Sequence, residues 1–330
     1  MIISPMATGN GAFVVHKILE QQLNDYRVFP YHPLKTLFPP LLFGIGRHNR
    51  ADLIHTTPDY AWFHARAGVP MVLTFHNFVL DAFMKAYSSR LQTIHYQTDL
   101  RWFTRQAVRK ANVITAVSRF TANLAKQELG LENIQVIYNG VDENRFYPNR
   151  PQATTGQPVK VLFSGNLTLR KGAQWLNAIA ERLNPNVRIF YTVGLRNNNA
   201  FKLSDKLQSL GSIRHQDMPE IYNQMDLLLF PTVREGFGLS VAEAMACGLP
   251  VVATDCSALP ELIDEGRGGF LCPMGDVDYF AEKINQLADS LSLRRLMGDY
   301  NRDKIEQAFT LKVMVENYRN LFEELSGRQS

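Results

Sequence analysis

Short apolar segments rich in Val, Ile and Leu alternate with helical patterns along most of the chain. Continuous apolar runs of this kind are typical of strands buried on both faces, as in parallel sheets that are covered by helices. In the first half the pattern predicts strands at 1–4, 52–56, 71–75, 113–117 and 134–138. In the second half it predicts strands in "VKVLFSG", "NVRIFYTVG", "DLLLFPT" and "LPVVATD".

A polar segment that contains prolines, "YPNRPQATTGQP" at 147–158, interrupts this alternation and is typical of an interdomain linker. The 330 residues are enough for two domains, each with its own core. We therefore predict an α/β protein of two facing Rossmann-like domains, at 1–150 and 151–330, with parallel sheets and a cleft between them. Ligands of such sheets bind at the carboxyl ends of the strands. Packing of the last helix back on the first domain is left open.

The composition narrows the class of protein. No apolar run reaches 18 residues and the start lacks a secretory signal, so we predict a cytoplasmic protein, with peripheral contact to the inner face of the membrane left open. The three cysteines have neither CxxC spacing nor a nearby histidine cluster, so neither disulfides nor a zinc site is expected. The formal net charge of +4 is mild, and no nucleic-acid partner is predicted.

The positive charge is unevenly spread along the chain. The stretch 90–110 carries five Lys and Arg residues among three aromatic residues, and Asp99 is its only acid. Such a segment suits an anionic membrane surface or an acidic substrate. A solvated helix face is the alternative, and the composition leaves both interpretations open.

Two carboxylates, Glu235 and Glu243, lie around the Gly-rich turn in "VREGFGLSVAEAMACG", which follows an apolar strand and opens a helix. Glycines let the backbone approach a ligand closely, and a helix start favours a phosphate through its N–H groups and dipole. Glu243 is predicted in the first helical turn. There it either accepts hydrogen bonds from vicinal hydroxyls, such as those of a ribose, or completes a capping box with Ser240. For Glu235 the alternative to a ligand contact is a solvated loop charge beside Arg234.

A second loop of the same kind, "VLFSGNLTLRKGAQWLNAI", places Arg170 and Lys171 where a helix is predicted to begin. An Arg fork and a Lys point charge can hold a diphosphate without metal, although a solvated loop is the alternative. No metal site is predicted, because the "DVD" at 276–278 opens a helical pattern and is better explained as an N-cap.

At these residues the chain resembles the retaining glycosyltransferases of family four. The segment "EGFGLSVAEAMACGLPVVATD" is similar to the Glu-x7-Glu segment of that family, and "ADLIHTT", "VLTFHN", "ITAVSRFTANLAK", "IQVIYNGVDENRFYP" and "GFLCPMGDVDYFAEKI" match it in order. The resemblance covers nearly the whole chain. It implies the GT-B fold, in which two Rossmann-like domains face each other.

The resemblance also implies roles for single residues of the second domain. Glu243 resembles the residue that holds the ribose hydroxyls of the donor, and Glu235 resembles the one that contacts the transferred sugar. Lys171 is similar to the family's phosphate-binding Lys, with Arg170 beside it. The backbone amides that are expected to face the donor sugar and its diphosphate belong to Gly236, Phe237, Gly238 and Leu239.

In the first domain the loop of Gly9, Asn10 and Gly11 resembles the family's Gly-rich loop at the cleft, with an ordinary strand-to-helix turn as the alternative. His76 resembles the histidine near the donor sugar; from the residues alone, a core histidine with satisfied hydrogen bonds is the alternative. Asn77 follows His76 where many relatives have Asp, so support from a carboxylate at that position is not expected.

The implied function is transfer of a hexose, of mannose or glucose type, from a GDP- or UDP-linked donor to a hydroxyl of a sugar or lipid-linked acceptor. The resemblance implies retention of the anomeric configuration and a place in bacterial polysaccharide, lipopolysaccharide or glycolipid synthesis. No cofactor is predicted. Two alternatives are a nonhydrolysing UDP-sugar epimerase and a noncatalytic sugar-nucleotide-binding protein. The two glutamates, Glu235 and Glu243, and the two cations of the other loop favour sugar transfer over both alternatives.

Overall fold

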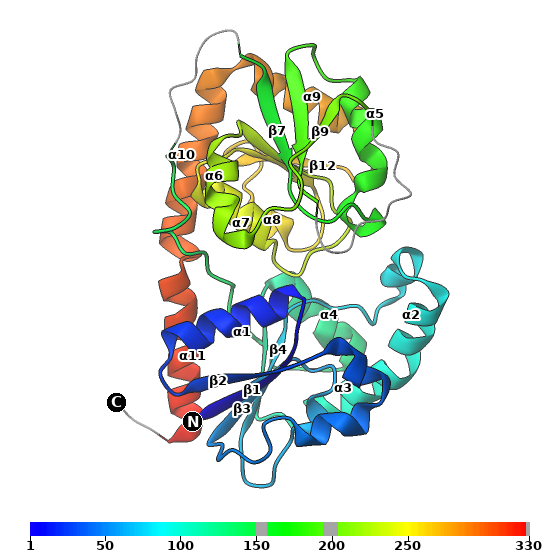
Figure 1. Ribbon diagram of the computed structural model, residues 1–330, viewed down its shortest axis with the longest axis vertical. Helices are drawn as coiled ribbons and strands as arrows, with labels where there is room; N and C mark the ends of the chain where they lie inside the picture. The colour runs from blue at the N-terminus through cyan, green and yellow to red at the C-terminus, as the bar shows by residue number, and fades with distance from the viewer. Residues whose placement is uncertain (150–156, 194–203, 328–330) are drawn as a thin grey trace. The chain divides into compact units, whose positions relative to one another are not determined.

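The computed structural model describes residues 1–149, 157–193 and 204–327, and the chain divides into two compact units (Figure 1). The first unit consists of Met1–Asn139 and Lys312–Ser330, so it includes the last helix, and the second is Gly140–Leu311. This division falls earlier than the predicted boundary at 150/151. Residues just after 139 belong to the second unit because the backbone of Val141 bonds to that of Phe309 and Leu311. Of the predicted linker, 150–156 lie outside the described residues.

The first unit contains a six-stranded parallel sheet in the order β2-β1-β3-β4-β5-β6. The strands are β1 (Ile2–Ala7), β2 (Tyr26–Tyr31), β3 (Leu53–Thr56), β4 (Met71–Phe75), β5 (Val113–Ala116) and β6 (Gln135–Val136). Strand β2 was not predicted, because Arg27 and Pro30 interrupt its apolar pattern. An edge strand tolerates both residues, since one side of it has no neighbouring strand to bond.

Helices cover this sheet, and local signals in the sequence set several of their ends. The helices are α1 (Gly11–Gln22), α2 (Arg90–His95), α3 (Arg101–Val108), α4 (Arg119–Leu129) and α11 (Leu311–Ser326), with shorter helical turns η1 (Pro33–Leu37), η2 (Pro39–Gly44), η3 (Ala61–Phe63), η4 (Ala82–Tyr87) and η5 (Tyr96–Leu100). Ser118 caps α4 by accepting from the Thr121 N–H, and Gly130 ends it with a φ of 69°. From α11, Tyr318 and Phe322 pack on His55 of the sheet.

The second unit contains another six-stranded parallel sheet, in the order β12-β11-β10-β7-β8-β9. The strands are β7 (Val159–Phe163), β8 (Val187–Tyr191), β9 (Leu207–Ser209), β10 (Leu227–Phe230), β11 (Val251–Thr254) and β12 (Gly269–Cys272). The four predicted strands are confirmed. The two edge strands β9 and β12 were not predicted. β9 spans only three residues, of which Leu207 alone is apolar, and β12 begins at Gly269 within a glycine pair that is typical of a turn.

The helices of the second unit follow its strands along the chain. They are α5 (Leu176–Glu181), α6 (Met218–Asn223), α7 (Leu239–Ala246), α8 (Leu259–Leu262), α9 (Val277–Asp289) and α10 (Leu291–Ala308), with the short turns η6 (Leu169–Lys171), η7 (Ala173–Trp175) and η8 (His215–Asp217). In Figure 1, α5 lies beside α9, and α10 packs along α7. Asp276 caps α9 by accepting from the Tyr279 N–H at 3.0 Å, which confirms the N-cap interpretation of "DVD".

Each sheet reverses its strand order at one point. In the first unit the reversal lies between β1 and β3, and in the second it lies between β7 and β10. Ligands of open α/β sheets bind outside the carboxyl ends of the strands at such a switch point. The loop 9–11 follows β1, and the loops that carry Arg170, Lys171 and Glu235 follow β7 and β10. The topology therefore places most of the predicted residues at the two switch points.

Among the described residues, the structure has no helix that is both long and apolar enough to span a membrane.

Candidate active site

The loop after β7 holds Arg170 and Lys171 in the short turn η6, and α5 begins only at Leu176. The prediction that the two cations open an α-helix is therefore wrong. Thr168 caps the turn by accepting from the Lys171 N–H. Gly172 then takes a φ of 81°, and a Cβ there would lie 2.0 Å from the Pro231 carbonyl oxygen. Only glycine lets the loop after β7 approach the loop after β10 so closely.

Backbone hydrogen bonds join these two loops. The Val233 N–H donates to the Arg170 carbonyl oxygen at 2.9 Å, and the Thr232 hydroxyl oxygen lies 3.0 Å from the same carbonyl oxygen. The loops come from neighbouring strands but lie about sixty positions apart in the sequence. The position of the Arg170 and Lys171 turn is thus fixed relative to Glu235.

The side chains of Lys171 and Glu235 form an ion pair. Lys171 Nζ donates to Glu235 Oε1 at 2.6 Å, and the two side chains are only 16% and 15% exposed. The Thr232 hydroxyl lies 3.1 Å from the same carboxylate oxygen, and Lys171 Nζ lies 4.7 Å from the centre of the Phe230 ring. Glu235 is therefore neither solvated nor paired with Arg234 as the alternative interpretation had it.

The charge of Glu235 is set by two opposing effects. Burial raises its pKa, but the positive charges of Lys171 and Arg170 lower it, as do the hydrogen bonds from Lys171 and Thr232, and the net shift is downward. Glu235 is consequently ionised at neutral pH and can accept hydrogen bonds from hydroxyl groups. Its backbone N–H donates to Ser257 Oγ at 3.0 Å, and Ser257 has a φ of 52°, which is rare for a residue other than glycine.

Glu243 lies on α7, but not in its first turn. The helix begins at Leu239 with Gly238 as its N-cap, so Glu243 is the fifth helical residue and Ser240 is inside the helix. The capping box with Ser240 and the placement in the first turn are therefore both wrong. The physical reason is Gly238, whose φ of 102° makes it the N-cap and lets the helix begin at Leu239, one residue before Ser240.

The carboxylate of Glu243 is held by two side chains from the segment that leads into and forms α6. Its Oε2 accepts from the Tyr222 hydroxyl at 3.1 Å, and its Oε1 lies 2.7 Å from His215 Nε2. Tyr222 is fully buried, whereas the His215 side chain is half exposed. One partner therefore fixes the carboxylate, while the other borders solvent.

The Gly-rich turn between the two glutamates is packed against its surroundings. Gly236, Phe237 and Gly238 are buried, and Leu239 is half-buried at the start of α7. A Cβ on Gly238 would lie 3.2 Å from a methyl group of Leu259. The first N–H groups of a helix have no acceptor within the helix, so the start of α7 can donate hydrogen bonds to a ligand.

In the first unit the predicted loop residues have mixed roles. Asn10 is the N-cap of α1, because its Oδ1 accepts from the Phe13 N–H at 2.8 Å. Gly9 has a φ of 81°, and a Cβ on Gly9 or Gly11 would meet no atom within 4 Å. The loop therefore needs glycine at position 9 for its backbone conformation and is open at both glycines.

His76 directly follows β4 and is half-buried. Its Nε2 lies 3.2 Å from Nε2 of His16, and burial lowers its pKa to about 3. It is therefore uncharged at neutral pH. The contact with His16 means that His76 belongs to a side-chain cluster of the first unit.

This cluster extends into the core of the first unit and was not found from the sequence. His16 Nδ1 and His55 Nδ1 each lie 2.7 Å from the Tyr26 hydroxyl. The two histidine rings stack, with 4.3 Å between their centres. Both histidines are fully buried, and burial, with a smaller effect from neighbouring histidines, holds their pKa well below its usual value. His55 Nε2 continues the chain to Thr74 Oγ1 at 2.8 Å.

The structure thus brings Arg170, Lys171 and Glu235 of the predicted set together. Four residues that bond to the two glutamates were not predicted, namely Thr232, Ser257, His215 and Tyr222. Thr232 ends the predicted strand "DLLLFPT", so its place at the carboxyl end of a strand was a usable signal. His215 and Tyr222 gave no such signal, because only folding brings them to Glu243.

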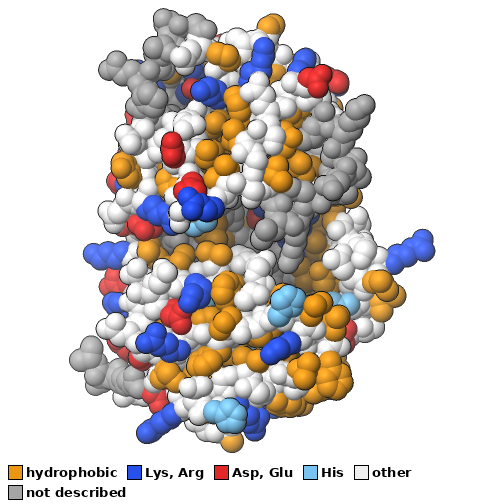
Figure 2. Space-filling model, viewed as in Figure 1, with side chains coloured by type: hydrophobic (Ala, Val, Ile, Leu, Met, Phe, Trp, Pro, Cys, Tyr) orange, Lys and Arg blue, Asp and Glu red, His pale blue; other side chains and the backbone are white. Residues whose placement is uncertain are grey.

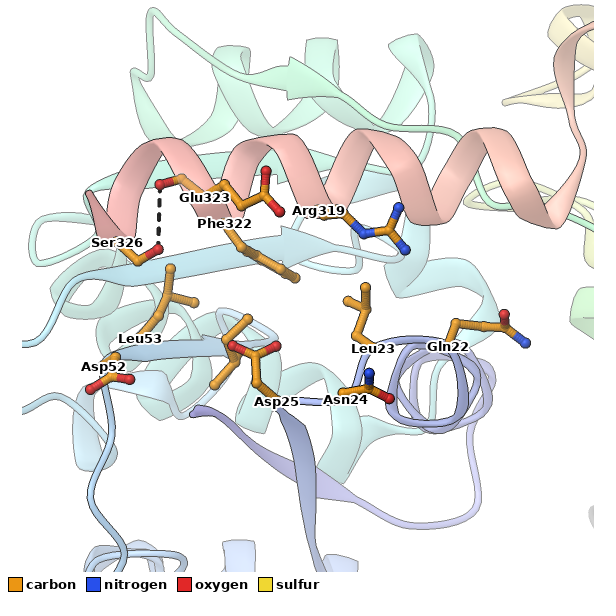
Figure 3. Close-up of a pocket in the computed structure, with 11 residues that line it drawn as sticks. Gln22, Leu23, Asn24, Asp25, Asp52, Leu53, Arg319, Phe322, Glu323 and Ser326 are labelled. Carbon is orange, nitrogen blue, oxygen red and sulfur yellow. Dashed lines mark hydrogen bonds between the residues drawn. The ribbon is translucent and has the colours of Figure 1, made fainter. Parts of the chain in front are cut away.

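The first unit also has a pocket of about 310 Å³, which lies away from all of the predicted residues. Figure 3 shows side chains that line it, among them Asp52, Arg319 and Phe322. It opens at the amino ends of β1 and β3, opposite to the sheet edge that carries the loop 9–11. This position does not favour it as the substrate site of an α/β sheet.

Family models identify the class of protein that these two units form. The model of Glycosyltransferase Family 4 matches residues 2–145, and the model of Glycosyl transferases group 1 matches residues 158–290. The chain belongs to this family of glycosyltransferases, which transfer sugars from nucleotide sugars.

Individual relatives agree with this assignment. The chain is 24% identical over 330 residues to the N-acetyl-alpha-D-glucosaminyl L-malate synthase of Bacillus anthracis, covering 92% of this chain and 82% of that protein. It superposes on the sucrose-phosphate synthase of Thermosynechococcus elongatus with a TM-score of 0.85 at 18% identity, over 99% of each chain. HepE of Anabaena, in complex with UDP-glucose, gives a TM-score of 0.78 at 21% identity over 98% and 99% of the two chains. The fold is therefore GT-B.

Proposed function

We propose that this glycosyltransferase moves a hexose of mannose or glucose type from a GDP- or UDP-linked donor to an acceptor hydroxyl, with retention and without a divalent metal. The observation that carries the proposal is the Lys171–Glu235 ion pair beside Arg170, at the switch point between β7 and β10. A charge pair of this kind suits a ligand that has an anionic diphosphate next to a neutral, hydroxyl-rich sugar.

The diphosphate is assigned to the positive side of this pair. When the glycosidic bond to the donor breaks, negative charge grows on the β-phosphate, and fixed cations that await this charge lower the barrier. Arg170 and Lys171 lie in one short turn whose backbone is tied to the next loop, so they need little rearrangement to meet that charge. The ionised Glu235 then accepts hydrogen bonds from hydroxyls of the transferred sugar.

The ribose is assigned to Glu243. A carboxylate offers about four lone-pair positions, and Tyr222 and His215 each occupy one. The remaining capacity matches two vicinal hydroxyls, and because His215 is half exposed, it can give way to a ligand. The buried Tyr222 would keep the carboxylate in place meanwhile.

In the first unit the candidates are His76 and the loop of Gly9, Asn10 and Gly11, which we assign to the sugar and acceptor side of the reaction. The low pKa of His76 makes it a neutral hydrogen-bonding group rather than a cation. The side chain of Asn10 already caps α1, so this loop would contribute backbone groups and open space.

Retention rests on the resemblance to the retaining members of the family. The predicted site offers Glu235 as its carboxylate beside the cations, and Lys171 already holds that carboxylate, so we favour attack from the front face over a covalent intermediate. Family membership favours transfer over the epimerase and the noncatalytic binding protein. Bacterial polysaccharide, lipopolysaccharide or glycolipid synthesis remains the proposed setting.

The test is release of nucleoside diphosphate from a panel of GDP- and UDP-hexoses by protein dialysed against EDTA, with and without sugar and lipid-linked acceptors. We expect turnover with one donor, a loss of at least about tenfold in Lys171→Ala, and little change in the exposed control Lys206→Ala. Proton NMR of the early product reads the anomeric configuration. Activity that returns only with added magnesium or manganese, or an inverted product, contradicts the proposal.

A further inference from the structure

A surface of the first unit combines exposed apolar side chains with an excess of positive charge. The segment that forms η1 and η2 exposes large hydrophobic residues, and α3 adds an exposed tryptophan. We call this set the apolar patch: Leu34, Leu37, Phe38, Leu41, Phe43 and Trp102. Leu37 is 80% exposed and Trp102 52%. A folded protein rarely leaves this much apolar surface in water without an interaction partner.

Aromatic contacts join the two segments into one surface. The Phe43 ring lies 5.9 Å from that of Trp62, and Trp62 lies 6.4 Å from Trp102. In Figure 2, hydrophobic side chains gather over the part of the first unit that carries α3 in Figure 1, with blue cationic groups among them. The apolar patch is therefore continuous from η2 to α3.

Cations border the aromatic rings of this surface. The Arg47 guanidinium lies 5.9 Å from the Phe43 ring centre, and Lys110 Nζ lies 5.0 Å from that of Trp62. Further exposed cations on the same segments are Lys35, Arg50, Arg105 and Arg109. Long basic side chains around aromatic and aliphatic groups are typical of surfaces that rest in the headgroup region of a bilayer.

The charge of these segments is opposite to that of the rest of the chain. Residues 32–50 and 101–110 contain seven of the 35 Lys and Arg residues and none of the 31 Asp and Glu residues. The remaining chain therefore has 28 basic and 31 acidic residues. One of the seven cations, Arg101, pairs with Glu128 at 2.8 Å.

We propose that this surface of the first unit docks on an anionic lipid bilayer, with the apolar patch entering the interface and the surrounding cations contacting lipid headgroups. Charge complementarity selects this occupant, because each basic residue near an anionic membrane adds to the attraction. A second copy of the chain would bring the same cations together and repel. The docking does not depend on which donor or acceptor the enzyme uses.

The test measures sedimentation of the full-length protein with vesicles of phosphatidylcholine alone and with about a third phosphatidylglycerol, at about 0.05 and 0.3 M salt. We expect binding to the anionic vesicles only, and weaker binding at the higher salt concentration. Arg105→Gln/Arg109→Gln should lower the partition coefficient by about fivefold for each charge removed. Leu34→Ser/Leu37→Ser should lower it by at least about tenfold.

The matched control is Arg295→Gln/Leu296→Ser on α10, which changes an exposed cation and a leucine that is 69% exposed in the second unit. It should bind as the unchanged protein does, and circular dichroism melting checks that each variant is folded. Absence of binding, or equal and salt-independent binding to neutral vesicles, overturns the proposal. So does self-association in analytical ultracentrifugation that Leu34→Ser/Leu37→Ser abolishes, because that result assigns the patch to a second copy of the chain.

Discussion

Replacing Lys171 by Met isolates the contribution of the ion pair to the stability of the second unit. The substitution keeps most of the aliphatic stem over the Phe230 ring and removes the charge that meets Glu235 at 2.6 Å. Exposed pairs contribute about 0 to 1 kcal/mol, whereas removing one partner of a buried pair costs about 3 to 5 kcal/mol. Because the two side chains are 16% and 15% exposed, we expect a loss of about 2 to 3 kcal/mol in unfolding free energy at neutral pH.

The pH dependence gives the sign of the effect. In the unchanged protein the pKa of Glu235 is lowered, so its contribution to stability is full above the unfolded pKa of about 4.3 and is lost as the pH falls through the folded value. Without Lys171 this pKa rises, because the largest of the effects that lower it is lost while burial still favours the uncharged carboxyl. The destabilisation by Lys171→Met should then be full at neutral pH and shrink toward acid pH, where the carboxyl is protonated.

Urea unfolding followed by circular dichroism, at about pH 7 and pH 4.5, measures both effects. The double variant Lys171→Met/Glu235→Gln also removes the carboxylate charge that Lys171→Met leaves without its partner, and it should lie within about 1 kcal/mol of the unchanged protein. With the single variant Glu235→Gln measured to complete the cycle, the coupling should be at least about 1 kcal/mol. A loss below about 0.5 kcal/mol in the single variant, or losses that simply add in the double variant, would refute the account of a buried, coupled pair.

Three further predictions concern the rest of the site and the core. Glu243→Gln should weaken donor binding by at least about tenfold in calorimetric titration. Circular dichroism should show that α7 is intact, because the N-cap of that helix is Gly238 and not Glu243. Unchanged donor affinity would mean that Glu243 has a structural role only. Gly172→Ala should lower the unfolding free energy, measured by urea unfolding, by more than about 2 kcal/mol. Gly211→Ala is the control, because its added Cβ meets nothing within 4 Å, and it should lower this free energy by only about 1 kcal/mol. Equal losses in the two variants would contradict the close approach of the loops. The pKa of His55 is held well below its unfolded value, so the unfolded chain takes up a proton at this residue that the folded protein does not. Below about pH 6.5, His55 should therefore lower the unfolding free energy by about 1.4 kcal/mol per pH unit. His55→Asn should remove this contribution, which is measured as a flatter pH dependence of stability in melts between about pH 7.5 and 5.5. An unchanged slope in that variant would mean that His55 takes up its proton in the folded state.

The sequence was sufficient for features that depend on neighbouring residues. Continuous apolar runs marked the interior strands of both sheets, because a strand buried on both faces must be apolar throughout. The N-cap at Asp276 also followed from its place before a helical pattern, since the hydrogen bond spans only three residues. The edge strand β2 was not predicted, because Arg27 and Pro30 interrupt its apolar pattern. A strand with a single neighbouring strand tolerates both residues.

The tertiary structure alone decided which partners the charged residues take. The sequence named Glu235 and Lys171 but not their contact, which depends on β7 and β10 being neighbours although two strands separate them along the chain. The prediction that Glu243 lies in the first turn of α7 was wrong for a local reason. The spacing of Ser240 and Glu243 fits a capping box, but the backbone conformation of Gly238 starts the helix earlier. His215 and Tyr222 around Glu243, and the buried chain of His16, Tyr26 and His55, had no local signal at all. Such contacts join residues that only the folded sheet order brings together, so spacing along the sequence carries no information about them.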